Sequence, residues 1–197
     1  MRQIVTTFII ASLAAAGALA QVDPGPDGIG IYFDEAATLT SLAVPTAGGE
    51  PTPVATAWLV ATRLSTAGDV GYWQAFVAPG GSPNPEAQVY VYGWPTVGWD
   101  QAMNMPGDPS HRFTVFIDHG LLPAGDIVVL ARLQVDCATA QPIPLHVWDA
   151  EIGVYGWPAR PLNPSSGPWD RPVAMINGQA PVAIEAAAWG AVKSLFR

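Results

Sequence analysis

Residues 111–135 read HRFTVFIDHGLLPAGDIVVLARLQV and contain two apolar runs that flank a turn. In the first run Phe113, Val115 and Ile117 alternate with other residues, which is the two-residue period of a β-strand with one buried face. The second run alternates in the same way, and the glycines and proline between the runs supply a connection. The sequence therefore predicts two neighbouring strands. The set predicted to point inward in the second run is Val129, Ala131, Leu133 and Val135.

The rest of the chain repeats this arrangement of short β-type runs between turns. It holds 20 glycines, 20 prolines and 8 tryptophans with only 12% charged residues, a composition typical of all-β domains and unlike that of disordered chains. About nine strands favour one all-β domain, a single antiparallel β-sandwich, over two domains. Proline-rich residues 157–172 are expected to cross its end. The predicted strands are Ile29–Phe33, Val54–Thr62, Tyr72–Val77, Gln88–Tyr92, Arg112–Asp118, Ile127–Val135, Leu145–Trp148, Ile152–Tyr155 and Pro172–Ile176.

The start of the chain differs from this sandwich. Residues 1–20 combine Arg2, an apolar stretch and small residues at Ala18 and Ala20, which is the pattern of a cleaved signal peptide. An uncleaved anchor is less favoured, because the strongly apolar part is short for a bilayer span of ~20 residues. We therefore expect a sandwich domain over residues 21–176 in a secreted protein of the periplasm, cell surface or extracellular space.

Charge and cysteine content limit which partners the protein can bind and how its fold can be stabilised. The formal net charge of −8 disfavours nucleic acid and anionic lipid, which bind basic patches. No later segment is long and apolar enough to span a membrane. The only cysteine, Cys137, has no partner within the chain. It is expected to be a buried small hydrophobe rather than an exposed thiol.

Three stretches carry a family resemblance: DPGPDGIGIYFDEAAT at Asp23–Thr38, NPSSGPWDRPVAMINGQAP at Asn163–Pro181 and WGAVKSLFR at Trp189–Arg197. They resemble a group of uncharacterised secreted bacterial β-sandwich proteins, which open with D-P-G-P-D-x-I-G-I-Y-F-D and close with W-G-x-x-K-x-L-[YF]-R. The resemblance implies a secreted location and an architecture, and it supplies no catalytic residue. A cysteine often follows the opening motif in that group, where Thr40 and Ser41 stand here, so no disulfide is carried over.

A looser likeness comes from GLLPAGDIVVLARLQV at Gly120–Val135. A turn followed by a long alternating strand resembles the later strands of cohesin-type sandwiches and implies a cohesin-like or jelly-roll-like fold. Cohesins are protein-binding modules of secreted and cell-surface proteins. A shared fold does not fix function, so this likeness informs the fold alone.

No set of residues indicates catalysis. The chain has no G-x-S-x-G nucleophile turn, and its three histidines lie apart without the spacing of zinc ligands. Nothing in the sequence places Asp100, Asp149 and Glu151 at the ~5–9.5 Å separations that glycosidase carboxylates need. We therefore predict a protein that is not an enzyme and has no catalytic residue.

Two sets of residues are candidates for ligand binding. Asp23, Asp27 and Asp34 flank the first strand beside Pro and Gly, and their oxygens suit calcium. Ordinary turn chemistry explains the same pattern and is preferred. Tryptophans in predicted turns either stack on sugars or on a partner's side chains, or cover the open ends of the sandwich, the interpretation we favour. The tryptophan candidates are Trp94, Trp99 and Trp157.

The C-terminal tail, residues 177–197, includes a predicted short helix. Trp189, Val192 and Phe196 recur at helical spacing, while Lys193 and Arg197 lie at the end where a helix dipole favours cations. Such a segment is too short to be stable alone in water. Either it packs on the sandwich or it is a handle read by export or surface-assembly machinery through Trp189, Lys193 and Arg197.

These observations leave two functional hypotheses. The leading one is a secreted, non-enzymatic β-sandwich that acts as an envelope or extracellular structural or adhesion module and binds protein or polysaccharide at the cell surface. The alternative is a carbohydrate-binding module that uses the tryptophans named above. No cofactor is expected beyond the calcium already considered.

Overall fold

A computed structural model describes residues 26–44, 54–65, 70–80, 89–100, 109–117, 122, 125–137, 140–154, 158–165 and 170–179. Within these ranges the chain forms twelve strands and no helix. The predicted signal peptide, Asp23, Trp157 and the tail residues Trp189, Lys193 and Arg197 lie outside them. The strands are β1 (Gly28–Tyr32), β2 (Ser41–Leu42), β3 (Val54–Thr62), β4 (Val70–Pro79), β5 (Val91–Pro95), β6 (Trp99–Asp100), β7 (His111–Phe116), β8 (Ile127–Asp136), β9 (Ile143–Val154), β10 (Arg160–Pro161), β11 (Asn163–Pro164) and β12 (Ala174–Ile176).

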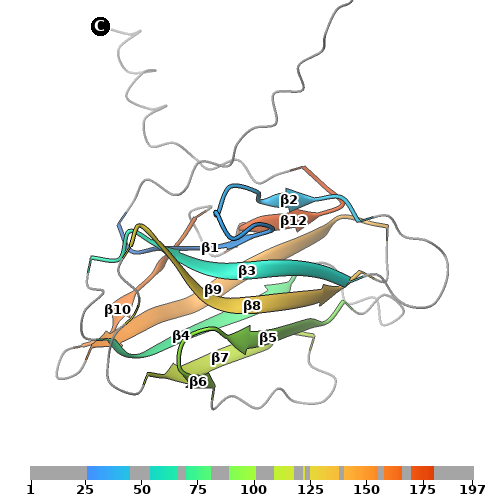
Figure 1. Ribbon diagram of the computed structural model, residues 1–197. Coiled ribbons are helices and arrows are strands. Elements are labelled where there is room, and N and C mark those ends of the chain that lie inside the picture. The colour runs from blue at the N-terminus through green and yellow to red at the C-terminus, as the bar shows by residue number, and fades with distance from the viewer. Residues whose placement is uncertain are drawn as a thin grey trace, which may run out of the picture.

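The strands form two sheets that pack face to face (Figure 1). The five-stranded sheet has the order β11-β1-β3-β8-β5, and the seven-stranded sheet has the order β2-β12-β9-β4-β7-β6, with β10 paired to β9. The pairs are antiparallel except β1 with β11 and β12 with β2. This arrangement confirms the predicted all-β sandwich.

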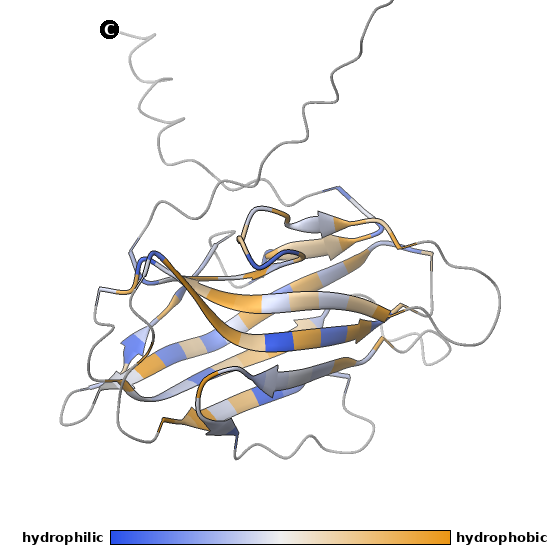
Figure 2. Ribbon diagram, in the orientation of Figure 1, coloured by the Kyte–Doolittle hydropathy of each residue, from blue (hydrophilic) through white to orange (hydrophobic). Residues whose placement is uncertain are grey.

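The core fills the space between the sheets because each strand alternates between an apolar and a more polar face, which Figure 2 shows most clearly along β8. Trp73 on β4 and Phe113 on β7 are fully buried, and their ring centroids lie 5.1 Å apart. Val115 and Ile117 are buried beside them, so the face predicted for this strand is confirmed. Cys137 is buried and free, as expected, and burial raises the pKa of its thiol.

The predicted inward face of β8 is only partly right. Leu133 and Val135 point inward as expected, but at the start of the strand Val128 and Leu130 are buried instead of Val129. The cause is a β-bulge, because Leu59 of β3 pairs with Ala131 whereas the next residue of β3, Val60, pairs with Val129. The extra residue, Leu130, shifts the alternation by one position.

Residues 143–154 form one strand where two were predicted. The gap expected between Trp148 and Ile152 is a second irregularity, since Gln74 of β4 pairs with Glu151 and Phe76 with Trp148. Asp149 within it has a φ of 47°. Three residue steps along β9 thus cover the same length as two residue steps along β4. The β9 strand therefore bends at this point and continues.

The proline-rich segment joins the two sheets. Arg160 and Pro161 pair with β9 of the seven-stranded sheet, and Asn163 and Pro164 pair with β1 of the five-stranded sheet. This supports the predicted crossing over the sandwich end, although neither short strand was expected. No helix of the described ranges is long and apolar enough to cross a membrane.

Candidate functional site: two exposed sheet faces

Two of the candidate tryptophans, Trp94 and Trp99, lie on the outer faces of the two sheets. Trp94 is in β5 and Trp99 in β6, so both belong to strands rather than to the turns in which they were predicted. Their residues are 50% and 46% exposed, so neither is a buried lid on the core. Because β5 and β6 belong to different sheets, the structure does not place the two rings on one platform.

A cross-strand row of large side chains runs over the five-stranded sheet. Tyr32 of β1 pairs with Trp58 of β3, Trp58 pairs with Arg132 of β8, and Arg132 pairs with Trp94 of β5. Directly paired residues point to the same side of a sheet, with their Cβ atoms about 4.5–5.5 Å apart. We call Trp58, Arg132 and Trp94, which are half-buried or exposed, the arginine row.

Gly93 explains why Trp94 points outward. A Cβ at Gly93 would collide with the Phe113 ring in the core, so this position faces inward and has no room for a side chain. Alternation then turns Tyr92 and Trp94 to the outer face, where Tyr92 is 43% exposed and pairs with Gln134 of β8. The arginine row therefore has a second, parallel row of polar and aromatic side chains beside it.

A small apolar cluster lies at one end of the arginine row, on the outer side of the sheet. Tyr32, Ala37 and Val60 are buried there, and Trp58 and Val129 pack against them. The loop from Phe33 to Thr40 covers this cluster and is closed by a hydrogen bond from Phe33 N to Leu39 O of 2.7 Å.

Asp34 holds that loop in place. Its carboxylate accepts hydrogen bonds from the Thr38 amide (2.8 Å), the Thr38 hydroxyl (2.5 Å) and the Leu39 amide (2.8 Å). Partial burial alone would raise the pKa of Asp34, but these hydrogen bonds outweigh it and hold the pKa below its ordinary value. Asp34 therefore acts here as a turn residue.

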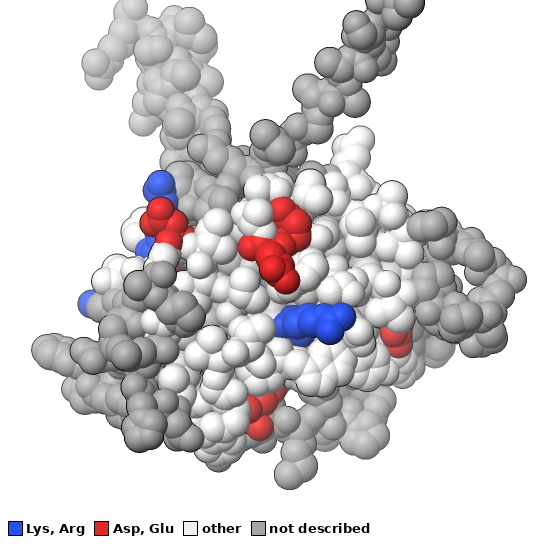
Figure 3. All heavy atoms as spheres, viewed as in Figure 1, with Lys and Arg blue, Asp and Glu red and all other residues white. Residues whose placement is uncertain are grey.

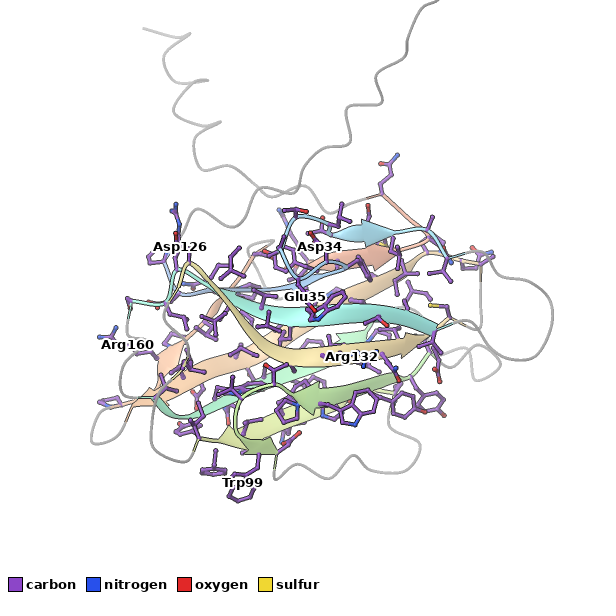
Figure 4. The ribbon with its side chains drawn as sticks, in the orientation of Figure 1. Asp34, Glu35, Trp99, Asp126, Arg132 and Arg160 are labelled. Atoms are coloured by element: carbon purple, nitrogen blue, oxygen red, sulfur yellow. The ribbon has the colours of Figure 1, made fainter. Side chains whose placement is uncertain are left out.

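Charges of opposite sign are exposed on this face. Figure 3 shows one basic group next to a cluster of acidic atoms, and Figure 4 identifies them as Arg132 and the pair Asp34 and Glu35. Arg132 and Glu35 are both exposed. No salt bridge within 4.0 Å joins them in the described part of the chain.

The outer face of the seven-stranded sheet carries a different aromatic surface. Trp99 of β6 lies 5.5 Å from Phe116 of β7, and Phe116 lies 6.2 Å from Tyr72 of β4, measured between ring centroids. We call these three rings the aromatic ladder. Tyr72 also covers Gly153 of β9, where a Cβ would collide with its ring.

A polar strip separates the aromatic ladder from a second group of rings. Phe76 and Trp148 lie 4.4 Å apart, with the Arg112 guanidinium 5.6 Å from the Phe76 centroid. Between the two groups, Gln74 pairs with Thr114 and with Glu151. Glu151 accepts a 3.0 Å hydrogen bond from the Tyr72 hydroxyl. Burial, with a further contribution from Glu151, raises the pKa of Tyr72.

His111 and Asp100 contact each other at the edge of the sandwich. His111 Nε2 lies 3.3 Å from Asp100 Oδ2, and Asp100 Oδ1 accepts a hydrogen bond of 3.1 Å from the Thr114 amide. Burial lowers the pKa of His111, and the contact with Asp100 offsets part of that shift. Both groups join β6 to β7.

Of the three calcium candidates, the structure describes two, at opposite ends of β1. Asp27 accepts hydrogen bonds from the Ser65 amide (2.8 Å) and hydroxyl, and Arg160 donates to that hydroxyl at 2.9 Å. No group of three or more His, Cys, Asp or Glu side chains suited to a metal occurs in the described ranges. Calcium binding by Asp23, Asp27 and Asp34 stays a prediction.

The arginine row was not predicted as a site. Part of it could be expected from the segment DIVVLARLQV, because an arginine that alternates with buried residues along a strand has to lie on the outer face of the sheet. What the sequence did not show is that Trp58 and Trp94, remote along the chain, flank Arg132 on the neighbouring strands.

No family model matches this chain, and no curated protein matches it in sequence. Among solved structures, the chain is similar to the sixth cohesin of scaffoldin B from Acetivibrio cellulolyticus, determined in complex with a mutant Cel5 dockerin. The TM-score is 0.50 at 10% identity, over 79% of this chain and 100% of the cohesin. The similarity establishes a cohesin-like sandwich fold.

Proposed function

We propose that this protein is a secreted, non-enzymatic binding module that docks a protein partner on the outer face of its five-stranded sheet. The arginine row carries the proposal. Trp, Tyr and Arg are the residues that most often dominate binding energy at protein interfaces. Here Trp58, Arg132 and Trp94 lie on adjacent strands, with Tyr92 beside them.

Two further observations support this proposal. The similar cohesin was solved bound to a protein, a dockerin. The sandwich also supplies a rigid support. The strands β3 and β8, which carry Trp58 and Arg132 on their outer face, pair along their whole length and bury their inner face in the core. Preformed side chains of this kind lose little conformational entropy on binding.

Photo-crosslinking in the native cells tests the docking face. Replacing Trp94 with p-benzoylphenylalanine is expected to give a discrete crosslinked adduct after irradiation. The matched control carries the same replacement at Trp148, on the outer face of the opposite sheet, and is expected to give none. Absence of an adduct at position 94, or equal adducts at both positions, would contradict the proposed face.

Cell fractionation tests the location separately. We expect the protein in the periplasmic, surface or extracellular fraction, shortened by the signal peptide of residues 1–20. Recovery of all the protein in the cytoplasm at its full length would refute secretion.

The aromatic ladder supports a second candidate, carbohydrate binding. Trp99, Phe116 and Tyr72 present a surface of neighbouring rings, and Gln74 and Glu151 supply hydrogen-bonding groups next to it. Sugar rings stack on aromatic faces while their hydroxyls bond to such neighbours. The two candidates use opposite sheets, so one set of variants separates them.

Tryptophan fluorescence during polysaccharide titration tests the second candidate. If the aromatic ladder binds sugars, the response is expected to disappear in Trp99→Ala and to persist in Trp94→Ala. A response that is lost in Trp94→Ala instead would assign sugar binding to the five-stranded sheet, and no response from the wild-type protein would reject this candidate.

A further inference from the structure

Arg132 in the arginine row and Glu35 in the loop after β1 have no side-chain partner within the described part of the chain. The side chains of Arg132 and Glu35 are exposed, and neither side chain makes a hydrogen bond or ion pair there. Asp34, the neighbour of Glu35, differs because its oxygens already hold the loop through Thr38 and Leu39. Glu35 and Arg132 are thus two charges of opposite sign on this face that remain for an intermolecular contact.

Their arrangement is self-complementary. A cation and an anion are exposed on the same side of the five-stranded sheet (Figures 3 and 4). When two identical faces meet across a two-fold axis, the cation of each copy can contact the anion of the other. The same ion pair therefore forms twice. A single partner charge would satisfy only one of the two groups, whereas a second copy satisfies both.

We propose that the partner of the arginine row is a second copy of this chain, bound face to face through reciprocal Arg132–Glu35 ion pairs. This inference rests on the proposed function, since it names the occupant of the same face. The exposed rings of Trp94 and Tyr92 flank the ion pairs and lose contact with water in the dimer. Such surrounding contacts exclude water from a central charge pair.

A two-fold contact uses the same surface on both copies, so it gives a dimer and does not extend into a larger assembly. The excess of acidic over basic residues on each copy opposes association at low ionic strength. Near physiological salt, repulsion between distant charges is screened within about 8 Å, while the close ion pairs persist in part. The dimer is therefore expected near physiological salt.

Sedimentation equilibrium of the protein as its own cells process it, near physiological salt, tests the inference. The wild-type protein is expected to form a dimer. Arg132→Glu and Glu35→Arg each replace two attractive pairs with two repulsive ones, and each is expected to weaken self-association by more than about tenfold. Mixing the two variants restores both attractive pairs and is expected to restore dimers, each made of one molecule of either kind.

Arg112→Glu is the matched control, because Arg112 is the exposed arginine over Phe76 on the opposite sheet. It is expected to dimerise as the wild type does. Far-UV circular dichroism of each variant confirms that a loss of dimer is not a loss of fold. A monomeric wild type, a dimeric Arg132→Glu variant, no restoration in the mixture, or dissociation by Arg112→Glu would overturn the inference.

The crosslinking experiment separates this inference from the proposed function. An adduct of doubled mass at position 94 supports a second copy. An adduct with a different protein leaves the docking face in place and overturns the choice of partner. No adduct overturns both.

Discussion

At Gly93 a side chain has no room, since a Cβ would enter the space of the Phe113 ring. Phe113 is itself fully buried against Trp73, so it has little freedom to move aside. The same position sets the orientation of β5 and so exposes Trp94. A residue without a side chain therefore determines where Trp94 of the proposed docking face points.

Replacing Gly93 with alanine is expected to lower the free energy of unfolding by about 1–3 kcal/mol, the usual cost of overpacking a core. Chemical denaturation of wild type and variant measures the difference. Gln134→Ala, on the outer face of the neighbouring strand, serves as control and is expected to change stability by less than about 0.5 kcal/mol. Equal effects of the two substitutions would contradict the assigned orientation of β5.

Asp34→Ala is expected to melt below the wild type at pH 7, because the Thr38 and Leu39 hydrogen bonds lose their acceptor. These bonds lower the pKa of Asp34, so the ionised form favours the folded state. The stabilisation is complete above the ordinary aspartate pKa of about 3.9 and is lost as the pH falls through the lowered pKa. Melting curves at several pH values should therefore converge in acid, and a constant difference would exclude this explanation.

Calcium provides a separate test at the same residues. The oxygens of Asp34 and Asp27 already accept hydrogen bonds from their own neighbours, so we expect added calcium or a chelator to leave the melting temperature unchanged. A calcium-dependent rise of the melting temperature in the wild type that Asp34→Ala abolishes would instead establish calcium binding at these residues.

Among the strands, the bulge of β8 shows what the two-residue alternation of apolar side chains can and cannot predict. The alternation identified the strand and its inner face from Ala131 onward, but Leu130 also points inward. A bulge depends on the partner strand, here on Leu59 of β3, which lies about seventy positions away in the chain. Likewise the split predicted near Asp149 was a bend within β9. Local patterns predict strands, whereas pairing decides their irregularities.

Single-residue deletions test the β8 bulge. Deleting Ala131 lets Leu130 take its place opposite Leu59 and keeps every later side chain on its face, so a folded protein is expected, less stable by about 1–3 kcal/mol. Deleting Gln134 leaves no spare residue and turns Val135 outward, so we expect loss of the cooperative thermal transition. Survival of both deletions to the same extent would contradict the bulge.

For the whole molecule, composition and alternation were sufficient to predict one all-β sandwich, because the inner faces must bury their apolar residues whatever the strand order. The order β11-β1-β3-β8-β5 was not predictable, since it depends on long-range pairing. The candidate site depended on that order. Trp94 was identified from sequence, but its neighbours Arg132 and Trp58 follow from the sheet.

The tail gives a prediction for the whole chain. The described core extends from Ile29 to Ile176, and Asn177 accepts a 2.7 Å hydrogen bond from the Val44 amide just after the last strand. If the tail is a handle, deletion of Trp189–Arg197 is expected to leave the melting temperature nearly unchanged and to alter the location of the protein. Unchanged export with a lowered melting temperature would show that the tail packs on the sandwich.

β5 is the last strand of the five-stranded sheet, and its outer edge offers little to another strand. Pro95 has no N–H group, and the Val91 N–H already donates to Pro109 O at 3.0 Å. Sheets with open edges polymerise into fibrils when molecules are crowded, and proline is one of the means by which natural proteins prevent it. Molecules of this protein at high concentration can thus contact one another through their sheet faces without amyloid growth from this edge.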